Sequence, residues 1–284
     1  MNKTFGVIGG DRRQAELARL LTADGNEVCT YGLERWKSGG AADLDRAAAA
    51  EVVVLPLPLC RGDGVLNCEE GAVPTAELFR RLRPGQLVLA GQVKTAQRQE
   101  AESCGLTLVD YFRREELTVA NAAATAEAAV QVVMEQLDRT LLGMDCLVVG
   151  FGRIGKLLSH RLHGLGARVT ATARKPEDLA WIRAFGWRPL RTGGLDGNLA
   201  PFGVVFNTVP ALILDRTLLA QLPADCLCVD LASVRGIDLT AAEELGLSGI
   251  WARSLPGRLV PRTAAAVIRD AVYHIILEER GDPA

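Results

Sequence analysis

Three glycines follow an apolar strand near the middle of the chain, at a spacing that fits a dinucleotide. The segment is Gly150-Phe151-Gly152-Arg153-Ile154-Gly155, preceded by Leu147-Val148-Val149 and followed by a helical pattern to Leu165. The first glycine permits a tight turn, the second lets the backbone approach a pyrophosphate, and the third lets helix and strand pack closely. The N–H groups of the helix N-terminus favour the phosphates. We predict a dinucleotide-binding domain over residues 143–254; a glycine turn without a ligand is the alternative.

The end of the next strand indicates which dinucleotide binds. NAD sites usually place Asp or Glu there, about 20 residues beyond the loop. This chain has Thr172-Ala173-Arg174-Lys175 at that place. Arg174 can bind a 2′-phosphate through two hydrogen bonds, and Thr172 can add a hydroxyl donor. We therefore predict NADP as the cofactor, held in part by Thr172, Arg174 and Lys175; a solvated basic turn is the alternative.

Two further strand ends belong to the same edge of this predicted sheet. They read Phe206-Asn207-Thr208-Val209-Pro210 and Asp230-Leu231-Ala232-Ser233. Ligands of doubly wound sheets bind at the carboxyl ends of the strands. The residues expected to line the nicotinamide ribose or the substrate are Asn207, Thr208, Val209, Pro210, Leu231, Ala232 and Ser233. In the alternative interpretation, Asn207 and Ser233 only cap helices.

A different glycine loop lies near the N-terminus. The segment Gly6-Val7-Ile8-Gly9-Gly10-Asp11-Arg12-Arg13 lacks the dinucleotide spacing, and Asp11 can cap a helix that runs to about Asp24. Arg12 and Arg13 fall in the first helical turn, where the helix dipole also favours anions. This loop suits a carboxylate better than a pyrophosphate. Two solvated helix arginines are the alternative.

Alternating strands and helices surround both loops. We expect strands at 5–8, 28–31, 52–55, 86–90 and 106–109, and again at 146–149, 168–173, 204–206, 226–231 and 249–251. The pattern predicts an α/β fold with two doubly wound, Rossmann-like parallel-sheet lobes. A long bridging helix over 122–140 joins the lobes, and a last helix over 261–279 packs back on the first lobe. The predicted domains are 1–120 with the returning 262–284 on the substrate side, and 121–261 for NADP.

Composition and charge argue against several classes of protein. The 32 Lys and Arg residues are balanced by 34 Asp and Glu residues, so there is no electrostatic reason to expect nucleic acid. We expect no membrane segment and no signal peptide after Met1, and therefore a cytoplasmic protein. The seven cysteines, Cys226 and Cys228 among them, have irregular spacing that is typical of buried free thiols. His160 and His163 lack a third ligand, so no metal is expected.

Taken in this order, the motifs resemble the family of the dipicolinate synthase A subunit of spore-forming bacteria, over nearly the whole chain. The resemblance rests on the glycine loop, Ala173-Arg174-Lys175, the two strand ends named above, Ile8-Gly9-Gly10-Asp11-Arg12-Arg13-Gln14, Leu55-Pro56-Leu57-Pro58, Asp110-Tyr111-Phe112, Arg114-Glu115-Glu116-Leu117, Asn121, Thr125-Ala126-Glu127 and Leu255-Pro256-Gly257-Arg258.

The resemblance implies an NADP-dependent oxidoreductase of sporulation that oxidises dihydrodipicolinate, or 4-hydroxytetrahydrodipicolinate, to dipicolinate. It also implies that the partner is a flavoprotein-like B subunit, and we expect a homo-oligomer. Asn121, Thr125 and Glu127 would be the catalytic residues, in the first turns of the bridging helix and facing a cleft. A dicarboxylate substrate would give a role to Gly10, Asp11, Arg12, Arg13 and Arg258.

The chain departs from the family pattern at several places near the expected cleft. The family usually has proline in place of Ala124, Pro-Gly-Gly in place of Val234-Arg235-Gly236, and lysine in place of Arg258, with glycine at the positions of Ser254 and Ala265. Two alternatives therefore stay open. One is a related NADP-dependent amino-acid or 2-hydroxy-acid dehydrogenase. The other is a non-catalytic NADP-binding subunit, because the sequence contains no obvious general base.

Overall fold

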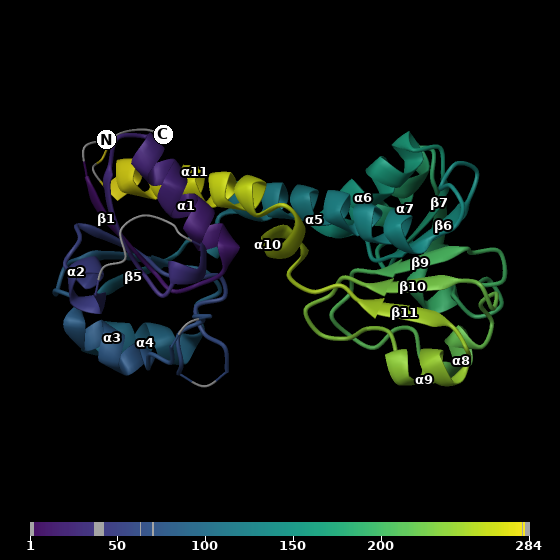
Figure 1. Cartoon of the computed structure of the whole chain (residues 1–284). Coiled ribbons are helices and arrows are strands. Elements are labelled where there is room, and N and C mark those ends of the chain that lie inside the picture. The colour runs from purple at the N-terminus through teal and green to yellow at the C-terminus, as the bar shows by residue number, and fades with distance from the viewer. Residues whose placement is uncertain (1–2, 37–42, 63, 70, 280, 282–284) are drawn as a thin grey trace. The chain divides into compact units, whose positions relative to one another are not determined.

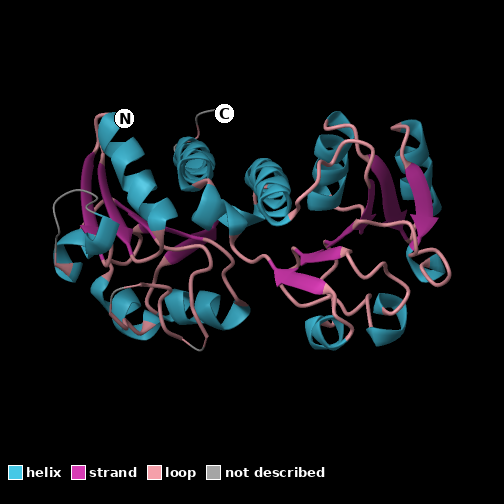
Figure 2. Cartoon of the chain, turned by 45° about the vertical axis from the view of Figure 1, so that its right-hand side comes forward, coloured by secondary structure: helices cyan, strands magenta, loops and turns pink. Residues whose placement is uncertain are grey.

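The chain folds into two compact units, each with its own parallel sheet. A computed structural model describes residues 3–36, 43–62, 64–69, 71–279 and 281 (Figure 1). Unit 1 comprises residues 1–121 and 256–284, and unit 2 comprises residues 122–255. Helices flank both faces of each sheet (Figure 2). This architecture confirms the predicted pair of doubly wound, Rossmann-like lobes.

Unit 1 is built on five parallel strands in the order β2-β1-β3-β4-β5. The strands are β1 (Thr4–Ile8), β2 (Glu27–Tyr31), β3 (Val52–Val54), β4 (Leu87–Ala90) and β5 (Thr107–Asp110). The central β3 consists only of valine and is fully buried, as a parallel strand covered on both faces must be. The strand order reverses beside β1, so the loop after β1 lies at the switch point where such sheets bind ligands.

Helices cover both faces of the unit 1 sheet. On one face α1 (Arg12–Ala23) packs against α11 (Pro261–Glu279), around the buried side chains of Leu17, Ile268 and Val272 (Figure 1). This contact confirms the predicted return of the last helix to the first lobe. The other face carries α2 (Leu44–Ala48), α3 (Thr75–Arg81) and α4 (Thr95–Ser103). Two short 3-10 helices, η1 (Glu34–Trp36) and η2 (Tyr111–Arg113), complete this unit.

Unit 2 contains six parallel strands in the order β11-β10-β9-β6-β7-β8. The strands are β6 (Asp145–Val149), β7 (Arg168–Ala173), β8 (Arg188–Arg191), β9 (Val204–Asn207), β10 (Leu227–Asp230) and β11 (Ser248–Trp251). Counted from β6, this is the strand order of dinucleotide-binding domains. The sequence pattern missed β8 because its four residues, Arg-Pro-Leu-Arg, contain one apolar side chain other than proline. The strand forms at the sheet edge, where half-exposed residues and proline are tolerated.

The helices of unit 2 are shared between the two faces of its sheet. One face carries α6 (Arg153–Gly164) and α7 (Pro176–Ala184), and the other carries α8 (Arg216–Leu219) and α9 (Leu239–Glu244) (Figure 1). The 3-10 turn η3 (Thr192–Gly194) follows β8, and α10 (Leu255–Leu259) follows β11 at the boundary between units.

The helix that connects the two units begins earlier than the sequence pattern indicated. Helix α5 (Glu115–Gln136) starts with two acidic residues, which the dipole of a helix N-terminus stabilises.

Helix α5 is also the one helix in the described part of the chain that is long and apolar enough to cross a membrane. Its 18-residue apolar window has a mean hydropathy of 1.3, and 50% of that window is buried inside the protein. Core helices of soluble proteins have this composition, so the helix alone is weak evidence for a membrane span.

All seven cysteines carry free thiols, as predicted, but only four are buried; Cys29, Cys60 and Cys104 are partly exposed. Burial raises the pKa of the Cys146 thiol to about 12 and that of the Cys60 thiol to about 11. Thiols with raised pKa values stay protonated at neutral pH and are poor nucleophiles and poor metal ligands. These two cysteines therefore serve packing.

Candidate functional site

The glycine loop after β6 has the close backbone packing that its spacing predicted. A β-carbon added at Gly155 would lie 2.1 Å from the carbonyl oxygen of Gly150. Gly150 itself has a φ of 103°, and a β-carbon there would lie 2.5 Å from Oγ1 of Thr208. Both positions therefore require glycine, and this lets α6 begin directly against the end of β6.

The middle glycine of the loop is open on its outer side. A β-carbon at Gly152 would meet no other atom within 4 Å, and this residue is the N-cap of α6 without a side chain that accepts the first helical N–H groups. Arg153 and Ile154 form the start of the helix, and Lys156 lies over the Phe151 ring at 5.0 Å. An exposed helix N-terminus with uncapped N–H groups fits the pyrophosphate of a dinucleotide.

Thr172 supports this loop from inside the protein. Its side chain is fully buried, and its Oγ1 accepts hydrogen bonds from the Gly150 N–H at 3.1 Å and from the Thr192 hydroxyl at 3.2 Å. The threonine thus positions the glycine loop. This role differs from the hydroxyl donor to a 2′-phosphate that the sequence suggested.

Two exposed cations follow β7, next to the glycine loop. Arg174 and Lys175 lie between the end of β7 and the start of α7. Within the described ranges, neither side chain forms an ion pair or a hydrogen bond, so both charges are available to a ligand. Because β7 neighbours β6 in the sheet, the two cations lie at the same carboxyl edge as the glycine loop.

The next strand ends are joined by a buried pair of polar side chains. Asn207 ends β9 and Asp230 ends β10, and both are completely buried. Asn207 donates from Nδ2 to the Val209 carbonyl at 2.9 Å and to Oδ1 of Asp230 at 2.9 Å, and its Oδ1 accepts from the Val209 N–H. Asn207 therefore folds the segment Thr208-Val209-Pro210 at the strand end and does not face solvent.

The Asp230 carboxylate holds the loop that follows β10. It accepts backbone N–H groups from Ala232 at 3.1 Å, Gly236 at 2.6 Å and Ile237 at 3.0 Å. A β-carbon at Gly236 would lie 2.2 Å from Nδ2 of Asn207, so only glycine fits there. Along this loop Leu231 and Ala232 are buried, whereas Ser233 is exposed. Asn207, for which helix capping was the alternative interpretation, is instead an anchor of the loop that follows β9.

The three residues predicted to be catalytic lie in the interior of α5, beyond its first turn. Asn121 and Thr125 are four residues apart, so they share a face of the helix. Glu127 is two residues beyond Thr125 and falls on the other side of the helix. Its exposed carboxylate accepts a hydrogen bond from Arg161 of α6 at 3.0 Å. The structure therefore brings Asn121 and Thr125 together and keeps Glu127 apart from them.

In unit 1 the N-terminus of α1 contains an internal ion pair. Asp11 is the N-cap and accepts from the Arg13 N–H at 2.9 Å, while the Arg13 guanidinium donates to both carboxylate oxygens and to the Leu57 carbonyl. Burial raises the pKa of Asp11, but the hydrogen bonds and the charge of Arg13 outweigh it, so the net pKa is lowered. Arg13 is buried and already paired, which makes it a structural cation more than an anion receptor.

Two other cations remain exposed near this helix start. Arg12 has a side chain that is 50% exposed, and among the described residues its one ion pair is a long contact of 3.9 Å to Glu16. A β-carbon at Gly257 would lie 2.8 Å from Nε of Arg13, so α10 packs directly on the ion pair and places Arg258 next in the chain. Arg258 is exposed and makes no ion pair with any described residue. Gly10, with a φ of 105°, forms the turn before the helix.

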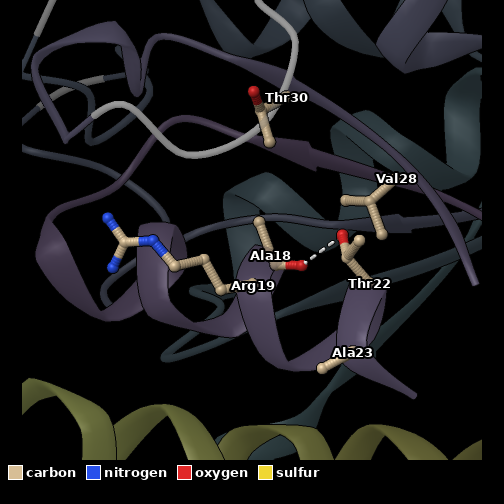
Figure 3. Close-up of a pocket in the computed structure, with 6 residues that line it drawn as sticks. All are labelled: Ala18, Arg19, Thr22, Ala23, Val28 and Thr30. Atoms are coloured by element: carbon tan, nitrogen blue, oxygen red, sulfur yellow. Dashed lines mark hydrogen bonds between the residues drawn. The ribbon is translucent and has the colours of Figure 1, made fainter. Parts of the chain in front are cut away.

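A separate hollow of about 280 Å³ lies between α1 and β2 (Figure 3). Its lining consists of Ala18, Arg19, Thr22, Ala23, Val28 and Thr30. The Thr22 hydroxyl donates to the Ala18 carbonyl at 2.9 Å, and Arg19 donates to Glu16 and to the Trp36 carbonyl. Since these polar groups are already engaged, the hollow is not a candidate functional site. In the described part of the chain, no group of three or more His, Cys, Asp or Glu could hold a metal ion.

The sequence did not reveal how much Asp230, at the end of β10, and Trp251, at the end of β11, contribute to holding the loop after β10. Asp230 anchors a whole loop, and the Trp251 indole donates from Nε1 to the Ala232 carbonyl at 3.0 Å. An acid at a strand end followed by a glycine six residues later was the available signal for Asp230. Trp251 gave no signal, because its partners come from another loop.

Comparisons with known proteins agree with this picture. The family model for the N-terminal domain of the dipicolinate synthase A subunit matches residues 4–112. The A subunit of dipicolinate synthase from Bacillus subtilis (strain 168) is 29% identical, over 96% of this chain and 95% of that protein. The crystal structure of the same subunit from Bacillus halodurans is 26% identical, with a TM-score of 0.85 and coverage of 96% of this chain and 97% of that one. The structure of the Bacillus subtilis protein has the same TM-score, with coverage of 99% and 98%.

More distant structures share the fold alone. L-alanine dehydrogenase is 18% identical, with a TM-score of 0.64 over 97% of this chain and 90% of that one. The sequence motifs, the two Rossmann-like units and the similarity over nearly the full length all agree. The chain is therefore similar over nearly its full length to the dipicolinate synthase A subunit, and its N-terminal part matches the family model of that subunit.

Proposed function

We propose that this chain is the NADP-dependent oxidoreductase subunit that oxidises dihydrodipicolinate, or 4-hydroxytetrahydrodipicolinate, to dipicolinate. One observation carries the proposal. The glycine loop, open at Gly152, lies at the same sheet edge as the unpaired Arg174 and Lys175, in a chain similar along its length to the dipicolinate synthase A subunit. The first feature suits a dinucleotide, the second a 2′-phosphate, and the similarity supports the substrate.

The cofactor proposal rests on the charges at the end of β7. A 2′-phosphate carries negative charge, and a guanidinium binds it with two parallel hydrogen bonds. Among the described residues, no carboxylate pairs with Arg174 or Lys175. NADP, when bound, would accept the hydride from the substrate. The backbone of Gly150, Gly152 and the first turn of α6 would hold its pyrophosphate, and the strand-end loops fixed by Asn207 and Asp230 would line its other half.

The substrate proposal rests on exposed cations. A dicarboxylate needs positive groups, and Arg12 and Arg258 are exposed arginines at and beside the start of α1. Gly10, Asp11 and Arg13 would hold this loop in shape through the buried ion pair. This assigns Arg13 a positioning role in place of direct contact with the substrate.

Conversion of a dihydropyridine dicarboxylate to the aromatic acid removes one hydride and one proton from the ring. The hydride leaves with its electron pair, the proton goes to a base, and the hydroxylated substrate also loses water. Aromaticity drives the reaction, so orientation and proton transfer are the main tasks of the protein. We assign Glu127 as the base; its carboxylate must break the ion pair with Arg161 before it can accept the proton. We assign Asn121 and Thr125 as groups that orient the substrate.

We further propose the setting of this activity. The family similarity favours a flavoprotein-like B subunit in the role of partner, a function in sporulation and a cytoplasmic location. A homo-oligomer is proposed as well. We expect a small dicarboxylate as the ligand, and we expect the chain to bind neither nucleic acid nor a membrane.

A second function is favoured by one observation. The Glu127 carboxylate is engaged with Arg161, so the chain could bind NADP while its partner supplies the catalytic groups. Glu127→Gln separates the two: a loss of turnover with unchanged NADPH affinity supports catalysis by this chain. Full turnover in the variant, together with the partner, would support the non-catalytic role.

The direct test mixes the purified chain with NADP and the product of dihydrodipicolinate synthase, with and without the partner, and follows dipicolinate by its absorbance. Dipicolinate and NADPH appearing in equal amounts support the proposal. No dipicolinate in either mixture rejects it.

A further inference from the structure

Two arginine side chains share one tryptophan ring at the carboxyl edge of the unit 2 sheet. The guanidinium carbon of Arg235 lies 4.5 Å from the Trp251 ring centroid, and that of Arg253 lies 4.4 Å from it. Trp251 ends β11 and Arg253 follows it directly beyond Ala252, whereas Arg235 comes from the loop after β10. Since β10 and β11 pair in register, with Asp230 opposite Trp251, both arginines lie at the same edge.

The shared ring is held in place by the loop anchored on Asp230. Its Nε1 donates to the Ala232 carbonyl at 3.0 Å, and the Ala232 N–H donates to the buried Asp230 carboxylate at 3.1 Å. The residue after Arg235 is Gly236, whose N–H also binds Asp230, at 2.6 Å. The backbone beside Arg235 and the indole are thus both tied to one buried acid, which orients the two guanidinium groups before any ligand arrives.

No carboxylate in the described part of the chain balances the charge of this cluster. Arg235 and Arg253 are exposed, and among the described residues neither forms an ion pair. The face of an indole attracts a cation, but this compensates only part of the repulsion between two cations at one ring. A planar anion that accepts hydrogen bonds from both guanidinium groups would relieve that repulsion.

The strand order indicates what kind of anion would come there. Arg174 follows β7, on one side of β6, while β9, β10 and β11 lie on the other side. A dinucleotide with its phosphate group at Arg174 crosses the sheet at β6, so its nicotinamide end points toward the ends of β9 and β10. Arg235 and Arg253 lie beyond the nicotinamide end, at β10 and β11. There we expect the substrate and not a phosphate group of the cofactor.

We propose that Arg235 and Arg253, stacked on Trp251, bind a carboxylate group of the dicarboxylate substrate. This inference rests on the proposed function and adds a substrate contact in the cofactor-binding unit. The guanidinium groups donate the hydrogen bonds, and Trp251 is the positioning residue that holds them.

The test measures binding of dipicolinate itself to the full-length chain with saturating NADPH, by titration calorimetry. Arg235→Gln and Arg253→Gln are each expected to raise the Kd about tenfold or more, since each removes a charge-assisted hydrogen bond. Arg253→Lys, which keeps the charge, is expected to fall between wild type and Arg253→Gln. Trp251→Phe should weaken binding less than either glutamine variant. Arg188→Gln is the control. Arg188 is also exposed, but it is the first residue of β8 and therefore lies at the amino ends of the strands, away from the carboxyl edge.

Three outcomes separate this inference from the proposed function. A rise in Kd and in KM for the arginine variants, with unchanged NADPH affinity, supports the inference. Wild-type protein that makes dipicolinate while both arginine variants keep its Kd and KM overturns the inference and leaves the proposed function standing. Variants that bind dipicolinate normally but lose activity only in the presence of the partner overturn it as well, in favour of an acidic protein surface.

Discussion

Asn207 donates a hydrogen bond from Nδ2 to Oδ1 of Asp230 at 2.9 Å, and neither side chain is exposed. The two residues lie opposite each other at the ends of β9 and β10. Each also binds the backbone of its own following loop, so this single pair fixes two neighbouring loops at the edge where a cofactor is expected. We therefore expect these polar residues to shape the site from beneath, while the loop residues that they hold contact the cofactor or the substrate.

Replacing Asp230 with asparagine is expected to destabilise unit 2 by about 3 kcal/mol, because an amide nitrogen would face backbone N–H donors that now share a carboxylate. Urea unfolding followed by tryptophan fluorescence measures this, since three of the four tryptophans, at 181, 187 and 251, belong to unit 2. Asp215→Asn is the control, because asparagine caps α8 as well as aspartate does. Equal stability of the two variants would contradict the anchoring role.

Gly152 and Gly155 are expected to respond differently to alanine. Gly155→Ala places a β-carbon against the Gly150 carbonyl and should cost about 3 kcal/mol of unfolding free energy, as overpacking does. Gly152→Ala meets no protein atom, so unfolding should change by less than about 1 kcal/mol. NADPH binding to Gly152→Ala should nevertheless weaken, because the new methyl group occupies the open side of the loop. Normal NADPH affinity in this variant would place the dinucleotide elsewhere.

Arg174→Ala is expected to weaken NADP binding about tenfold or more while leaving NAD binding nearly unchanged, because only NADP carries the 2′-phosphate. Fluorescence titration with NADPH and NADH measures both affinities. Arg188→Ala, at the opposite end of an adjacent strand, is the matched control. If the variant prefers NADP over NAD as strongly as the wild type does, the charge of Arg174 is not what selects the 2′-phosphate.

The Asp11–Arg13 pair predicts a pH dependence for the stability of unit 1. The pKa of Asp11 is lowered in the folded chain, so its contribution is complete above the unfolded pKa, about 4, and is lost as the pH falls through the folded value. Asp11→Asn keeps a helix cap but leaves the buried Arg13 unpaired, which should cost about 3 kcal/mol at pH 7.

The difference in unfolding free energy between wild type and Asp11→Asn should therefore shrink as the pH falls below about 4. Urea titrations at several pH values, followed by circular dichroism, measure this change. Asp43→Asn serves as the control, because Asp43 caps α2 from an exposed position without a buried arginine. A difference that stays constant from pH 7 to strongly acidic pH would show that the ion pair is not its source.

Local patterns in the sequence were sufficient for much of the fold. The last helix begins at Pro261 and ends at Glu279, as its apolar period and its initial proline indicated. The edge strand β8 was missed because its charged residues show no alternation, and α5 was expected to begin at Ala122 because the acidic residues at its start were not recognised as a helix N-terminus.

The candidate site was predictable where backbone geometry demands a residue type. Gly150 and Gly155 illustrate this, because steric contact excludes any side chain there. The orientation of polar side chains was not predictable. Thr172 points to the Gly150 N–H and to Thr192, and Arg13 donates to the Leu57 carbonyl; these partners are brought close only by the folded sheet.

Formation of dipicolinate tests the central claim most directly. The full-length chain, NADP and the product of dihydrodipicolinate synthase are combined, with and without the flavoprotein-like partner, and absorbance is followed for dipicolinate and NADPH together. We predict equal amounts of both products, with NADP preferred over NAD. The absence of dipicolinate in both mixtures, from protein that binds NADPH normally, would contradict the proposed function.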